Sequence, residues 1–346
     1  MAGVVACLSS AGVNVAVLMS SGFIFGNMLK NAFCIPRPPS HLVHRARPSD
    51  ADDYSMPSTH SLQAISLPLW LTVYLVRECD VVSWSWFAWW IPAALTWMLC
   101  ISWSRLYLGA HTVQDVVMGW IVGAVISIAY CFIYPHLGPK LLAGDAHACG
   151  QLFAFSLLVM YLHPMEVFIN TSMSKWSIIV SQSGYLTSCD LAGVLAGIAI
   201  GVPITPKSFP ISVLERPYTS VIRFLVGGTL AAIIYVLARK TLRSILLLGY
   251  NAVGIPTFDP PAKTAQIPPT LTLKKEGDRV SFESLNVYKF NNGPAPNFQW
   301  LTQSYLGLLL LGSGIQVMPI AKFLQYTALS WTVSTGAPLL LEAIGL

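Results

Sequence analysis

The feature that most constrains this chain is a series of apolar runs, most of them about 20 residues long, separated by polar segments. An α-helix of about 20 apolar residues is long enough to cross the hydrocarbon core of a bilayer. Of the 346 residues, 54% are hydrophobic and only 10% are charged, whereas soluble domains carry about 25% charged residues. The sequence therefore predicts an all-α polytopic membrane protein. The formal net charge of +5 is small for this length, so no nucleic-acid partner is expected.

The apolar runs predict a helical bundle of eight or nine transmembrane spans. The expected spans are residues 4–29, 61–77, 85–104, 113–134, 148–163, 188–205, 219–239 and 321–344, with a candidate ninth at 300–319. Residues 255–298 are polar and rich in proline, which indicates a flexible aqueous loop. In the sixth span Gly193, Gly197 and Gly201 recur every four residues, a pattern typical of closely packed membrane helices.

Polar residues collect at three span boundaries. The three clusters are Lys30 to Pro38 after the first span, Met56 to His60 before the second, and Ser104 to Asp115 between the third and fourth. If the first span ends on one side of the membrane, the alternation of spans places all three clusters on that same side. The sequence thus predicts that they meet in a single site.

The residue types in these clusters suit the binding and transfer of a phosphoryl group. Three cations lie at one bilayer edge, namely Lys30, Arg37 and Arg105. Such a cluster is costly unless an anion lies between the cations. Serine and threonine hydroxyls can add hydrogen bonds to phosphate oxygens, and histidines can act as nucleophile and proton donor. Asp115 follows His111 by four residues, so both share one helix face and the carboxylate can orient the imidazole.

Two simpler interpretations remain for the same residues. A single Lys or Arg at the end of a span often anchors the helix by reaching the interface. The group His60, His111 and Asp115 also offers ligand types suited to a metal ion. Three neighbouring cations argue against a divalent cation, and no cofactor is expected.

The three clusters resemble the signature of the type 2 phosphatidic acid phosphatase superfamily. Its first motif, K-x6-RP, matches Lys30 with Arg37 and Pro38; its second, PSGH, stands here as Pro57 to His60 with Thr59 at the glycine position. Its third, SR-x5-H-x3-D, matches Ser104, Arg105, His111 and Asp115. Within the superfamily, "PRPPS", "PSTH", "SRLYLGAHTVQD" and the C-terminal segment are most similar to the sphingosine-1-phosphate (long-chain base phosphate) phosphatases.

The resemblance implies a division of roles. His111 is expected to attack phosphorus and form a phosphohistidine, with Asp115 orienting it, while His60 protonates the leaving alkoxide and then activates water. The expected phosphate-binding residues are Lys30, Arg37, Ser58, Thr59, Ser104 and Arg105, and no metal is required. By the same resemblance the core is vanadium-haloperoxidase-like, and the active site faces the lumen of the endoplasmic reticulum.

The expected organisation is a catalytic membrane core over 1–135, accessory transmembrane helices over 136–254, the polar loop 255–298 and C-terminal transmembrane helices over 299–346. Relatives carry about two more spans before the first motif, so the chain is expected to lack an N-terminal part.

The leading hypothesis is hydrolysis of sphingoid base 1-phosphates at the membrane. The alternatives are a phosphatidate or isoprenoid diphosphate phosphatase of the same superfamily, and a non-catalytic transporter or scaffold. The sequence leaves the lipid chain length, the oligomeric state and the role of residues 255–320 open.

Overall fold

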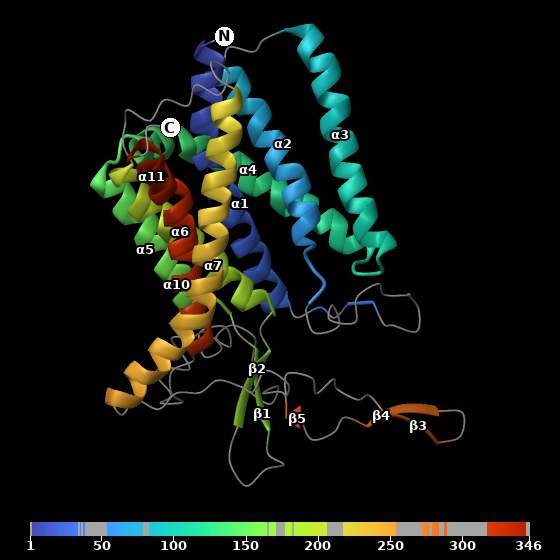
Figure 1. The fold of residues 1–346 in the computed structure, drawn as a ribbon. Helices are drawn as coiled ribbons and strands as arrows, with labels where there is room; N and C mark the ends of the chain where they lie inside the picture. Colours follow the sequence, from blue (N-terminus) through green and yellow to red (C-terminus); the bar gives the residue numbers. More distant parts are fainter. Residues whose placement is uncertain are drawn as a thin grey trace.

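The structure, a computed structural model, shows a bundle of long helices with short strands at one end (Figure 1). It describes residues 2–33, 35, 37–38, 54–78, 83–164, 166–170, 177–181, 183–205, 217–253, 272–276, 279–283, 287–288 and 317–343.

Helices occupy eight of the expected spans. They are α1 (Ala2–Phe33), α2 (Thr59–Glu78), α3 (Trp84–Tyr107), α4 (Val113–Leu142), α5 (Ala146–Leu162), α6 (Ser183–Gly201), α7 (Pro217–Val253) and, at the C-terminus, α10 (Val317–Trp331) continued by a π-helical turn (Thr332–Gly336) and α11 (Ala337–Ala343). Several are longer than predicted, such as α4, which continues to Leu142, and α7, which continues to Val253. The candidate ninth span, 300–319, lies almost entirely outside the described residues.

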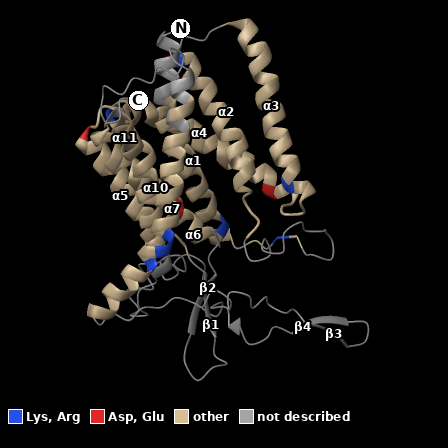
Figure 2. Cartoon of the chain, viewed as in Figure 1, with Lys and Arg blue, Asp and Glu red and all other residues tan. Residues whose placement is uncertain are grey.

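Four helices of the described chain are long and apolar enough to cross a membrane. They are Ala11–Phe33, Trp84–Tyr107, Val113–Leu142 and Gly184–Ile204. α5 is apolar but has only 17 residues, and α7 contains several Arg and Lys. Figure 2 shows that α3 and α4 carry charged residues only near their ends. These four helices support the prediction of a helical membrane protein, and the larger number of spans stays a prediction.

The N-terminal core is formed by α1, α2 and α4, which approach closely at glycines. A Cβ atom built on Gly22 or Gly26 of α1 would collide with Gln63 or Thr59 of α2. On α4, a Cβ at Gly119 would lie 2.6 Å from the carbonyl oxygen of Ser58. Because glycine has no Cβ, these residues allow the helices that carry the first, second and third motifs to lie in direct contact.

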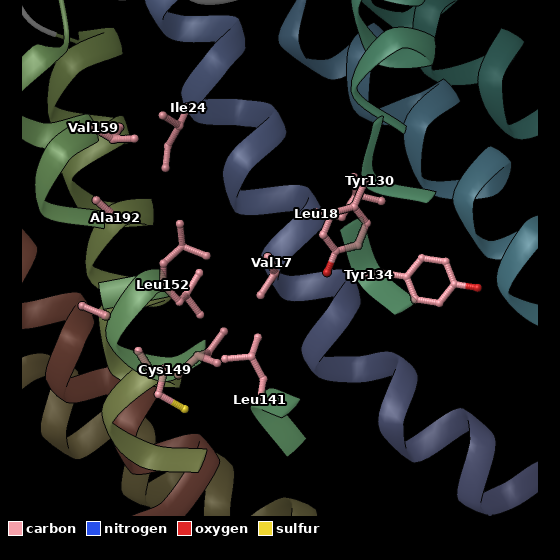
Figure 3. Close-up of a cluster of buried hydrophobic side chains, with 14 of the residues drawn as sticks. Val17, Leu18, Ile24, Tyr130, Tyr134, Leu141, Cys149, Leu152, Val159 and Ala192 are labelled. Atoms are coloured by element: carbon pink, nitrogen blue, oxygen red, sulfur yellow. The ribbon is translucent and has the colours of Figure 1, made fainter. Parts of the chain in front are cut away.

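A second set of contacts joins this core to α5, α6 and α10. Figure 3 shows the shared core, in which Val17, Leu18 and Ile24 of α1 face Leu152 and Val159 of α5 and Tyr130 of α4. The glycine stripe predicted for packing fulfils that role. A Cβ at Gly193 would lie 2.3 Å from the carbonyl oxygen of Phe323 in α10, and a Cβ at Gly197 would lie 2.5 Å from Cβ of Ser330. An ion pair of 2.8 Å between Lys322 and Asp190 also links α10 to α6.

Buried polar contacts fix the end of α1. His163, fully buried after α5, donates from Nδ1 to the carbonyl of Pro164 over 2.8 Å and lies 2.9 Å from the Ser188 hydroxyl through Nε2. Asn27 donates to the same hydroxyl, and Asn31 donates to the carbonyl of Pro164. These contacts hold the helical turn that contains Lys30 against α6 and the end of α5.

Within the described residues, short strands depart from the predicted all-α fold. β1 (Glu166–Asn170) pairs antiparallel with β2 (Ser177–Ser181) and with β5 (Val287–Tyr288), and β3 (Thr272–Glu276) pairs with β4 (Arg279–Glu283). β3, β4 and β5 lie within residues 255–298, where the sequence predicted only a flexible loop. All five lie outside the helical bundle (Figure 1).

Candidate active site

The loop between α3 and α4 positions His111. α3 ends at Tyr107, and Gly109 adopts a φ of 64°, a left-handed conformation that suits glycine. The amide of Gly109 donates to the carbonyl of Leu106, and that of Ala110 donates to the carbonyl of Arg105. This pair of bonds is a Schellman motif. It turns the chain sharply just before His111, which is 5% exposed.

The first turn of α4 positions Asp115. Thr112 caps the helix: its hydroxyl accepts from the amide of Asp115, and the Asp115 carboxylate accepts from the amide of Thr112 over 2.6 Å. This capping box satisfies backbone donors at the helix start. It also holds the Asp115 side chain beside the imidazole, with 3.8 Å between Asp115 Oδ2 and His111 Nδ1.

The second motif forms the start of α2 and contacts α4. Ser58 precedes the helix; its amide donates to the carbonyl of Asp115 over 3.0 Å, and its hydroxyl accepts from Ser61. Thr59 is buried, and its methyl group faces Gly26 of α1. Gly26 has no side chain and therefore leaves room for Thr59, the residue that replaces the glycine of the superfamily pattern.

Three cations surround His111 from separate parts of the chain. Arg37 donates from Nη1 to the carbonyl of Ala110 over 2.9 Å, which ties the first motif to the His111 loop. Burial lowers the pKa of His111 most, and the positive charges of Arg37, Lys30, Arg105 and His60 add to this effect in that order, so that the pKa falls to about 2. Figure 2 shows the cationic end of α3 beside the acidic start of α4. The ring is thus neutral at physiological pH, as a nucleophile must be.

The sequence reasoning missed Ser55, a residue that the structure places between His111 and Asp115. Ser55 is 1% exposed, and its amide donates to the carbonyl of Ile35. Its hydroxyl donates to Asp115 Oδ2 and lies 3.5 Å from His111 Nδ1. The sequence hinted at a role for Ser55 only through its position, three residues before Ser58 of the second motif.

These contacts determine which ring nitrogen is available. The Ser55 hydroxyl hydrogen goes to the carboxylate, so the Ser55 oxygen can only accept from His111. Both oxygens near Nδ1 are then acceptors, which favours a hydrogen on Nδ1. In the neutral ring, this leaves the lone pair on Nε2.

Two other predicted site residues, His60 and Ser104, are exposed, unlike His111 and Asp115. His60 is exposed on the first turn of α2, with its ring 6.1 Å from that of Phe23 in an edge contact. Ser104 is exposed, and its hydroxyl donates to the carbonyl of Ile101 within α3 rather than toward His111. The structure does not gather His60, His111 and Asp115 into a group able to hold a metal, and no other such group occurs among the described residues.

The segment that contains the three motifs matches a known family model. Residues 11–137, which contain all three motifs, match the model of the PAP2 superfamily. The chain is 27% identical to a probable sphingosine-1-phosphate phosphatase of Dictyostelium discoideum over 44% of this chain and 39% of the relative. It is 30% identical to a dihydrosphingosine 1-phosphate phosphatase of Schizosaccharomyces pombe, over 34% of this chain and 29% of the relative.

A dolichyldiphosphatase of Saccharomyces cerevisiae is 29% identical over 32% of this chain and 46% of the relative. The aligned stretches thus cover less than half of each of these three relatives. No solved structure matches the chain.

Proposed function

Because residues 11–137 carry a PAP2 superfamily domain, we propose that the protein is a metal-independent lipid phosphate phosphatase acting on sphingoid base 1-phosphates. The observation that carries the proposal is a buried, neutral His111 surrounded by Arg37, Lys30 and Arg105. A phosphate monoester brings negative charge to these cations and its phosphorus to a nitrogen lone pair.

The reaction has two steps. In the first, His111 Nε2 forms a bond to phosphorus while the bond from phosphorus to the lipid oxygen breaks, and His60 gives its proton to that oxygen. In the second, His60 takes a proton from water as the water oxygen attacks phosphorus, and the nitrogen–phosphorus bond breaks to release inorganic phosphate. Asp115 stabilises the ring when it becomes cationic.

The phosphoryl oxygens are bound by Lys30, Arg37 and Arg105, with Ser58, Thr59 and Ser104 as further donors. The Arg37 contact to the Ala110 carbonyl supports this role, because it holds the guanidinium next to His111. Ser104 requires a rotation of its side chain, since its hydroxyl now donates to Ile101. It is the phosphate ligand with the least support.

The substrate class is proposed from the relatives. Two of the relatives named above are described as phosphatases of sphingosine or dihydrosphingosine 1-phosphate. The dolichyldiphosphatase favours an isoprenoid diphosphate as the second candidate. We place the protein in the endoplasmic reticulum membrane with the three motifs facing the lumen.

The proposal is tested by phosphate release from a panel of lipid phosphates. Purified protein is incubated with a sphingoid base 1-phosphate, phosphatidate and an isoprenoid diphosphate, with His111→Ala as control. We expect the sphingoid base 1-phosphate to give the highest kcat/KM and the variant to release nothing. Release by the His111→Ala variant at the wild-type rate would contradict the proposed nucleophile.

Metal independence is tested with the same substrates. Excess EDTA should leave the rate unchanged, because cations of the protein neutralise the phosphate. Vanadate, which adopts the five-coordinate geometry of the transition state, should inhibit. Loss of activity in EDTA with recovery on adding Zn²⁺ or Mg²⁺ would replace the phosphohistidine mechanism by a metal-dependent one.

A further inference from the structure

We propose that Ser55 is a positioning residue that couples Asp115 to His111, so that the carboxylate acts on the nucleophile through the serine hydroxyl. This inference rests on the proposed function. It adds a residue outside the K-x6-RP, PSTH and SR-x5-H-x3-D segments, on the N-terminal side of the second motif.

The geometry around His111 Nδ1 carries the inference. Asp115 Oδ2 lies 3.8 Å from Nδ1, beyond hydrogen-bond distance, whereas Ser55 Oγ lies 3.5 Å away, at the outer limit of that distance. Ser55 also donates to the same carboxylate oxygen. Among the contacts described for Nδ1, the hydroxyl is therefore the nearer acceptor, and the carboxylate polarises it.

Ser55 is well fixed for this role. Its side chain is 1% exposed, so water does not compete for its hydrogen bonds. Its amide donates to the carbonyl of Ile35 over 2.8 Å, and the amide of Ser58 three residues later donates to the carbonyl of Asp115. Backbone bonds on both sides of the serine thus fix its position relative to the first and third motifs.

The electrostatic surroundings explain why the coupling matters. His111 is faced by Lys30 of α1, Arg37 of the following segment, His60 of α2 and Arg105 of α3, and all of them oppose a positive charge on its ring. When phosphorus bonds to Nε2, the ring becomes cationic, and Asp115 on α4 is the negative group beside it. Through Ser55, this charge stabilises the Nδ1 hydrogen in the transition state.

Removal of the hydroxyl should slow the reaction without weakening substrate binding. In Ser55→Ala, Nδ1 loses its nearest acceptor and the Nε2-protonated tautomer becomes populated, which blocks attack. We expect kcat to fall about 10- to 100-fold, the range for a hydrogen bond to a charged group, with KM changed less than twofold. Ser66→Ala is the matched control, because Ser66 is also a buried serine but donates to Gln63 on α2.

Two measurements test the proposal. The first is kcat and KM of both variants at matched thermal stability in detergent. The second is the ¹⁵N NMR spectrum of selectively labelled histidine, in which a His111→Asn variant identifies the His111 signals. The wild-type protein and Ser66→Ala should show a protonated Nδ1, and Ser55→Ala a mixture of tautomers.

A Ser55→Ala variant with unchanged kcat, or with an unchanged tautomer, would overturn the role of Ser55. The NMR measurement does not depend on turnover. If the wild-type protein hydrolyses no lipid phosphate, the proposed function fails while the tautomer result still decides whether Ser55 orients His111.

Discussion

At the scale of single residues, His111 and His60 lie in different environments, and this difference predicts separable roles. His111 is buried, and burial and neighbouring cations lower its pKa to about 2, whereas His60 is exposed on the first turn of α2. A general acid matters most when the leaving group is poor. His60→Ala should therefore lower the rate with a lipid phosphate about 10²- to 10⁴-fold, and should lower it much less with an activated aryl phosphate.

The measurement is kcat/KM of His60→Ala, His111→Ala and Asp115→Asn with both substrates. His111→Ala should lose activity on both, because no nucleophile remains. Asp115→Asn should fall between the two histidine variants. Equal losses for both substrates in His60→Ala would show that His60 does not protonate the leaving group.

At the scale of helices, the close contact of α2 with α4 holds the site together. A Cβ at Gly119 would lie 2.6 Å from the carbonyl oxygen of Ser58 and 3.1 Å from Cβ of Ser61. Gly119→Ala should separate the helices where the amide of Ser58 donates to the carbonyl of Asp115. We expect unfolding to become easier by about 1–3 kcal/mol, together with a loss of phosphatase activity.

Gly150→Ala is the control for this substitution. Gly150 lies in α5, and nothing is within 4 Å of a Cβ built there. Alanine at an open helical position should stabilise the protein by about 0.5–1 kcal/mol and leave activity unchanged. The melting temperature of each variant is measured by thermal unfolding in detergent. If Gly119→Ala melts at the same temperature as Gly150→Ala, α2 and α4 are not in close contact at Gly119.

At the scale of the whole molecule, the three motifs meet at one end of the bundle, and α3 connects this end to the other. The ends of α1 and α3 and the starts of α2 and α4 all contribute to the site. In a background without the seven native cysteines, Ser83→Cys lies just before α3, and Gln114→Cys lies in the first turn of α4, beyond the other end of α3. Both native side chains are exposed.

A membrane-impermeant maleimide should label Ser83→Cys in sealed microsomes, and Gln114→Cys only after permeabilisation. This outcome follows from a site that faces the lumen and from the length of α3, which is sufficient to cross the membrane. Labelling of both positions in sealed microsomes would contradict a transmembrane α3. The reverse pattern would place the site on the cytoplasmic face.

The sequence by itself predicted the helices and the residues of the candidate site. Apolar runs of membrane length form helices in almost any context, because backbone groups in lipid must bond within their own segment. The motif spacing also has a local meaning: between Arg105 and His111 it contains Gly109, whose positive φ ends α3. The four-residue step from His111 to Asp115 contains the capping box of α4.

Only the tertiary structure decided how these residues act on one another. Burial and charge set the protonation of His111, and the charges come from segments up to 81 residues away in the chain, such as Lys30. Ser55 could not be found from its sequence neighbours, because its proposed role depends on its distance from Asp115 on α4. Electrostatic and hydrogen-bond energies depend on separation in space, and the local sequence does not specify that separation.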